Sequence, residues 1–117
     1  MKRIAACALA CAGLAAFGAS ACETPSVITV PDGKAATMDQ MVDAQKKVKE
    51  YMANMDDYLA CIDGELKTAG DDAPDEFKSL MTQRHNDAVS EMEAIAGAFN
   101  EQVRAFKAAH PQPQGQQ

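Results

Sequence analysis

The sequence has 117 residues, of which 17 are acidic and 11 basic, giving a net charge of −6 with both histidines neutral. This length limits the protein to one small domain with a modest core. An acidic chain has no electrostatic basis for binding nucleic acid or an anionic lipid surface. The sequence contains no G-x-S-x-G, nucleotide-binding glycine loop, H-E-x-x-H or C-x-x-C, so it indicates no enzyme activity.

The first 21 residues have the composition of a cleavable export signal. A positively charged start at 2–3 precedes an apolar run over 4–18, and small residues at 19–21 match the pattern that signal peptidase recognises. The apolar run is shorter than the roughly 20 residues that a membrane-spanning helix needs. The sequence therefore predicts export to the bacterial periplasm, with cleavage between Ala21 and Cys22.

Cleavage at that point would leave a mature chain of 96 residues with two of the four cysteines, Cys22 and Cys61. The mature chain would carry 17 acidic against 9 basic side chains, a net charge of −8. We interpret this charge as a source of solubility.

Residues 22–36 are expected to form an extended strap. Pro25 and Pro31 restrict the backbone, and the Pro-Asp-Gly sequence that begins at Pro31 is a turn signal. Between the two prolines, Ser-Val-Ile-Thr-Val is rich in β-branched residues that favour an extended backbone.

Residues 37–69 are predicted to form a long amphipathic helix. Thr37 followed by Gln40 fits a capping box, and Gly70 is a stop signal. Apolar residues recur at alternating intervals of three and four, which is typical of a helix in a coiled coil or bundle. The two rows are Met38, Gln45, Met52, Leu59 and Leu66, and Met41, Val48, Met55, Ile62 and Ala69, with Val42, Tyr51 and Tyr58 beside them.

A second helix is predicted over residues 73–109, after a short turn in which Asp72 or a neighbour caps the helix and Pro74 lies in its first turn. Its rows are His85, Met92, Phe99 and Phe106, and Met81, Ala88, Ile95, Gln102 and Ala109. Two helices joined by so short a turn lie antiparallel. The expected fold class is all-α, a two-helix hairpin over 37–109. Residues 110–117 are expected to be a disordered tail in which His110 has no specific role.

The seam between two helices needs further cover, because each helix of a hairpin buries only one face. The sequence leaves three sources open. They are the strap, a second copy of the hairpin in a dimeric four-helix bundle, and an unknown protein partner.

Cys22 has two possible fates. The residues before it fit a lipoprotein signal imperfectly, because Ala19 stands where leucine is usual, and lipidation would leave Cys61 unpaired in an oxidising compartment. Alternatively, Cys22 pairs with Cys61. The 16 residues from Cys22 to Met38 reach about 50 Å when extended, and Cys61 lies about 35 Å along the helix. Gly64 is expected to let the strap approach the helix closely near this cross-link.

The pattern C-x-x-P, P-D-G and Y-L-x-C resembles an uncharacterised group of small exported proteobacterial helical proteins. It is carried by Cys22, Pro25, Pro31, Asp32, Gly33, Tyr58, Leu59 and Cys61, over roughly the first half of the mature chain. The resemblance implies no known activity. It favours the two cysteines as a pair, and we prefer the disulfide to lipidation, which remains the alternative.

Methionine and histidine side chains suggest one metal hypothesis. Thioether and imidazole ligands suit Cu(I), and the candidate ligands are Met38, Met41, Met52, Met55, His85 and Met92. All of them occupy rows that face the seam, where methionine is an adaptable core residue. We therefore expect no metal or other cofactor.

The sequence predicts a non-enzymatic envelope protein with a structural or protein-interaction role, soluble in the periplasm. The alternatives are a periplasmic Cu(I)-binding or chaperone-like hairpin, and an outer-membrane lipoprotein. Membrane association is expected only if Cys22 is lipidated.

Overall fold

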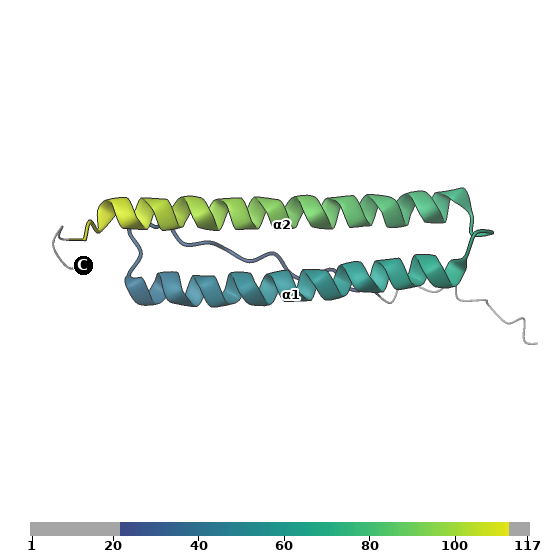
Figure 1. Ribbon diagram of the computed structural model, residues 1–117, viewed down its shortest axis with the longest axis horizontal. Helices are drawn as coiled ribbons and strands as arrows, with labels where there is room; N and C mark the ends of the chain where they lie inside the picture. The colour runs from purple at the N-terminus through teal and green to yellow at the C-terminus, as the bar shows by residue number, and fades with distance from the viewer. Residues whose placement is uncertain (1–21, 113–117) are drawn as a thin grey trace, which may run out of the picture.

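The computed structural model describes residues 22–112, so the predicted export signal and the last part of the predicted tail lie outside the described residues. Two long helices, α1 (Met38–Ala69) and α2 (Asp75–Ala109), run antiparallel and pack along their length (Figure 1). The predicted all-α hairpin is confirmed. No helix within the described residues is long and apolar enough to cross a membrane.

The ends of α1 follow from its sequence. The Thr37 hydroxyl accepts a hydrogen bond from the Gln40 backbone N–H at 3.2 Å, and the Gln40 side-chain oxygen accepts one from the Thr37 N–H at 2.8 Å. This is the predicted capping box. Gly70 ends the helix with φ 75°, a left-handed conformation that glycine adopts without steric cost, and its N–H donates to the Leu66 carbonyl.

The start of α2 differs from the prediction. Pro74 occupies the N-cap position, two residues later than expected, and Asp72 does not cap the helix. A proline disfavours the helical conformation for the residue before it, so Ala73 stays outside the helix. Pro74 has no side-chain acceptor, but Asp75 and Glu76 place negative charge in the first turn, where it complements the helix dipole.

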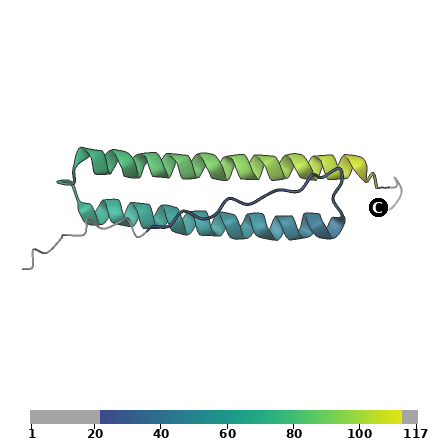
Figure 2. The same ribbon diagram turned by 180° about the vertical axis from the view of Figure 1, so that it is seen from behind.

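Residues 22–36 form the extended strap, which runs back along α1 on one side of the seam (Figures 1 and 2). One end begins at Cys22, which is bonded to Cys61 in the second half of α1. The other end reaches the start of α1 through a turn at 33–35, which begins at the last residue of the predicted Pro-Asp-Gly signal. The strap is therefore a third layer of the fold, antiparallel to α1.

The turn at the far end of the strap is fixed to α2. The Asp32 carboxylate accepts a hydrogen bond from the Lys34 N–H at 3.0 Å, and the Asp32 carbonyl accepts from the N–H groups of residues 35 and 36. The Gly33 N–H donates to the Gln102 side-chain oxygen at 2.9 Å. A Cβ on Gly33 would lie 2.0 Å from the Gln102 carbonyl oxygen, so only glycine fits here.

The predicted role of Gly64 is wrong. A Cβ at Gly64 would meet nothing within 4 Å, so no backbone approaches this residue. Gly64 is an exposed helical glycine whose carbonyl accepts a hydrogen bond from the Thr68 hydroxyl at 2.8 Å. The strap approaches a helix backbone closely at Gly33 instead. Gly33 packs against Gln102 of α2, near the end of the hairpin away from the turn between the helices.

The strap makes the core asymmetric. The α1 row of Met41, Val48, Met55 and Ile62 is buried in the seam. Ala44, Tyr51 and Tyr58 are also buried, on the side that the strap covers. On the opposite side, which we call the strap-free face, apolar side chains stay exposed or half-buried. The strap-free face comprises Met38, Val42, Gln45, Met52, Leu59 and Leu66 of α1, and His85, Val89, Met92, Phe99 and Val103 of α2.

The two glycines provide a matched pair of substitutions. Gly33→Ala should lower the free energy of unfolding by about 1–3 kcal/mol, because the added methyl group overlaps the α2 backbone. Gly64→Ala should leave it unchanged or raise it by up to about 1 kcal/mol, because alanine is the better helix former and has open space. Urea unfolding of the disulfide-intact proteins measures both. A larger loss for Gly64→Ala than for Gly33→Ala would contradict the strap geometry.

Candidate functional site

The cross-link between Cys22 and Cys61 fixes the first residue of the strap. The two Cα atoms lie 5.7 Å apart and the sulfur atoms are bonded, over a sequence separation of 39 residues. The predicted disulfide is confirmed. Cys22 is 8% exposed and belongs to the main core cluster, so the bond lies against the hydrophobic core rather than on a free loop.

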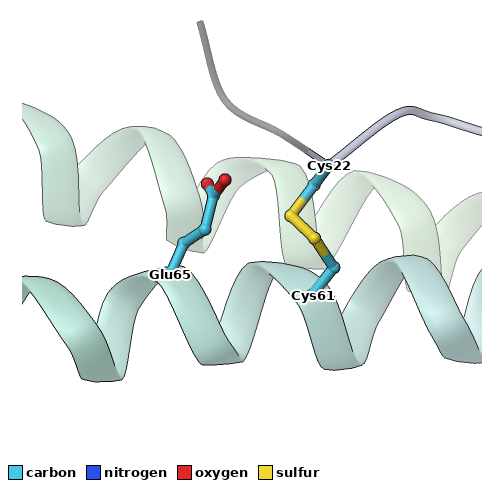
Figure 3. A group of neighbouring side chains, drawn as sticks. All are labelled: Cys22, Cys61 and Glu65. Atoms are coloured by element: carbon cyan, nitrogen blue, oxygen red, sulfur yellow. A yellow bond between two sulfur atoms is a disulfide. The ribbon is translucent and has the colours of Figure 1, made fainter. Parts of the chain in front are cut away.

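Glu65 lies beside the disulfide, four residues after Cys61 on the same helix (Figure 3). Its carboxylate and the two sulfur atoms lie within 4.8 Å of one another. Thiolates with a carboxylate are ligands for a borderline-soft cation, but here each sulfur is already bonded to the other. A carboxylate at this position also disfavours the thiolate that thiol–disulfide exchange requires. The arrangement is therefore suited to a lasting cross-link. The sequence analysis missed Glu65, although the i,i+4 spacing was a usable signal.

A groove of about 690 Å³ lies on the strap-free face, at the end of the hairpin away from the turn. Its lining is mainly apolar, and no strap residue contributes to it. The lining residues are Met38, Met41, Val42, Gln45, Phe99, Val103, Phe106, Lys107, His110 and Gln112. Met38 is 58% exposed and Val42 41% exposed, while Met41 and Phe106 form a buried floor.

His110 has a specific role, contrary to the prediction. Its ring stacks on Phe106, with the ring centroids 4.3 Å apart and the planes 25° from parallel. Its Nδ1 lies 3.0 Å from the Phe106 carbonyl oxygen, and its backbone N–H donates to the same carbonyl. His110 therefore ends α2 and closes one edge of the groove.

The six residues of the Cu(I) hypothesis do not gather at one place. Met38 and Met41 lie at the open end, in the lining of the groove. Met52, Met55 and Met92 belong to or pack against the main core cluster, and Met55 is fully buried. The His85 Nδ1 lies 3.5 Å from an Asp63 carboxylate oxygen. Met41, Met52, Met55 and Met92 thus pack along the seam, whereas Met38 is exposed at the mouth of the groove.

Tyr51 is the polar group most deeply placed beneath the strap. Its hydroxyl is buried, with the Glu91 carboxylate as its nearby polar neighbour but no hydrogen bond of full geometry among residues 22–112. Burial raises the pKa of the Tyr51 hydroxyl, and the nearby carboxylate of Glu91 raises this pKa further. The hydroxyl therefore stays neutral in the folded protein at pH values where an exposed tyrosine ionises.

Comparisons with known proteins identify no relative: no family model, curated protein or solved structure matches the chain. The fold and the site therefore rest on the residues themselves.

Breaking the cross-link should release the strap. Cys61→Ser should lower the free energy of unfolding by about 3–4 kcal/mol, the value that the chain-entropy model gives for a loop of this size. Limited proteolysis should then cut within residues 23–30, between the broken cross-link and the turn that Gly33 keeps anchored to α2. Reduction of the wild-type protein should reproduce both effects. An alkylatable Cys61 in unreduced protein, or a diacylglyceryl mass on Cys22, would show that the cysteines are not paired.

Tyr51→Phe should alter stability mainly at alkaline pH. At pH 7 the free energy of unfolding should change by no more than about 1 kcal/mol, because the change removes a buried hydroxyl whose only polar neighbour among residues 22–112 is the Glu91 carboxylate. Because the folded-state pKa is raised, the stability from neutral Tyr51 is fully present below about pH 10 and declines at higher pH. The variant should lose stability less steeply above pH 10. Urea titrations between pH 8 and 11 measure this, and superimposable profiles would contradict it.

Proposed function

We propose that this chain is a non-enzymatic, exported protein of the bacterial envelope that acts by binding another polypeptide through its strap-free face. The observation that carries the proposal is the unequal cover of the seam. The cross-linked strap closes one side, whereas the other side keeps an apolar groove of about 690 Å³ at its open end.

The exposed apolar residues of this face are continuous rather than scattered. Met38 and Val42 of α1 border the same groove as Phe99 and Val103 of α2. A contiguous apolar patch on a small protein marks a place where another surface binds. A groove between two helices suits an amphipathic helix laid along it, and flexible methionine side chains adapt to different apolar partners.

The scaffold around the groove supports recognition by a preformed surface. The capping box orders the start of α1, the stacked His110 ring orders the end of α2, and the Gly33–Gln102 hydrogen bond ties the strap to α2 beside them. A surface that is already ordered loses less conformational entropy when it binds.

The proposed location follows from two features of the sequence. The first 21 residues have the order of a cleavable signal peptide. The Cys22–Cys61 disulfide is the kind of bond that persists in an oxidising compartment such as the periplasm. Because lipidation would need the Cys22 sulfur, the disulfide favours the soluble form over the outer-membrane lipoprotein.

Site-specific photo-crosslinking in the living bacterium tests the proposal. A photoreactive residue at Val42 should give a discrete cross-linked product, whereas the same residue at Val27 should not. Val27 is the matched control because it is 65% exposed and lies on the strap. Mass spectrometry of the product distinguishes a second copy of this chain from a different protein. Equal cross-linking from the two positions would contradict a binding site on the strap-free face.

A second measurement separates loss of binding from loss of folding. Val42→Asp combined with Val103→Asp should reduce the cross-linked product from a probe at Met38 by at least about tenfold, because burying an unpaired carboxylate in an apolar contact is costly. Val27→Asp should leave the product unchanged. Both variants alter partly exposed positions, and circular dichroism checks that the hairpin is retained.

A further inference from the structure

We infer that the strap-free face binds a second copy of this chain, packed antiparallel about a two-fold axis that passes close to Met52 and Met92. This inference rests on the proposed function and names the partner of the same face. Three observations carry it: the distribution of charge along the hairpin, the spacing of the apolar residues, and one pair of opposite charges on α1.

The net charge is confined to one half of the hairpin. Residues 54–91, which include the turn, carry ten acidic and three basic side chains. The remaining parts of the hairpin, together with residues 24–36 of the strap, carry six of each and are neutral. Glu23 adds one more acidic side chain, next to Cys22, which is bonded to Cys61 in the acidic half. A parallel dimer would place the two acidic halves against each other. An antiparallel dimer separates their centres by more than the Debye length of about 8 Å at physiological salt.

The row of α1 residues spaced by seven on the strap-free face is centred on Met52. Met38 and Leu66 each lie 14 residues from it, and Gln45 and Leu59 each lie seven residues from it. In an antiparallel pair centred on Met52, Met38 lies opposite Leu66 of the second copy, so the exposed methionine and the half-buried leucine cover each other. The groove at the open end of one copy thereby receives apolar side chains from near the turn of the other.

The same axis passes α2 at Met92. Glu91 lies close enough to Tyr51 to raise the pKa of its hydroxyl, so Met52 and Met92 lie at the same level of the hairpin. Phe99 and His85 each lie seven residues from Met92. A single axis therefore places Met38 opposite Leu66 on α1 and Phe99 opposite His85 on α2, while the polar Gln45 lies opposite Leu59.

Lys49 and Asp56 provide the charge complementarity. Both are exposed, and their spacing of seven places them on one row of α1, along the border of the strap-free face. The antiparallel arrangement brings Lys49 of each copy near Asp56 of the other, so the contact occurs twice. Exposed ion pairs add little affinity. These two pairs act mainly by selecting orientation and register, while the apolar residues supply most of the binding energy.

A charge exchange tests the orientation. Purified mature protein with its disulfide intact should show a concentration-dependent monomer–dimer equilibrium by sedimentation. Lys49→Glu alone or Asp56→Lys alone should weaken dimerisation by roughly tenfold, because each creates two like-charge contacts. The double variant should recover to within about threefold of wild type. The matched control is Lys47→Glu, because Lys47 lies on the strap side of α1 and pairs with Asp43.

Engineered cysteines test the register independently of affinity. Under mild oxidation, the Met52→Cys protein should form a disulfide-linked dimer in which the cysteines introduced at position 52 of two chains are bonded to each other. Met38→Cys should not link to itself, but a mixture of Met38→Cys and Leu66→Cys proteins should give the mixed dimer. Self-linking of Met38→Cys with no mixed product would overturn the antiparallel arrangement, and intact mass under non-reducing conditions identifies each product.

The results also separate this inference from the proposed function. A chain that sediments as a monomer at every concentration, yet cross-links from Val42 to a different protein, would overturn the inference and leave the proposed function standing. A monomer with no product specific to Val42 would overturn both. Recovery in the charge-exchanged double variant, together with Met52→Cys self-linking, would support both.

Discussion

The strap is ordered because it is fixed at both ends, and the rest of the structure depends on this constraint. An extended segment without a hydrogen-bonded partner strand loses about 1–2 kcal/mol of backbone entropy per residue when it is ordered. The covalent bond to Cys61 and the close packing of Gly33 on α2 limit the freedom of the residues between them. Apolar contacts of residues such as Ile28 then suffice to hold the strap in the seam.

Cover on one side alone makes the two faces of the hairpin different. Beneath the strap, Tyr51 and Tyr58 are buried with the disulfide, and the core there is closed. On the other face, Met38 and Val42 remain exposed although they belong to the same helix. A hairpin with equal faces could associate through either of them, whereas within residues 22–112 the strap covers one side of the seam and leaves the other open. The cross-link thus favours the strap-free face as the surface that we propose for binding.

Local signals in the sequence predicted most of the local structure, apart from the start of α2 and the role of His110, and of the long-range contacts only the disulfide was predicted. The helix of residues 37–69 follows from its capping box and apolar spacing, which involve neighbours in the sequence. The disulfide could be expected because an even cysteine count and the reach of the strap limited the alternatives. The contact of Gly33 with Gln102 spans 69 residues, and nothing near either residue reveals it. The expectation for Gly64 rests on its closeness to Cys61 in the sequence, and that proximity does not show which helix surface the strap crosses.

The strap also shapes the groove, which connects the cross-link to the proposed binding surface. Ala36 at the end of the strap packs with Met41 and Phe106 in the smaller core cluster, and these two residues form the floor of the groove. Gln102, which accepts the hydrogen bond from Gly33, lies one turn before Phe106 on α2. Displacement of the strap would therefore remove packing from behind the groove without altering a residue at its mouth. The proposed binding on the strap-free face therefore depends on the packing of the strap on the opposite side.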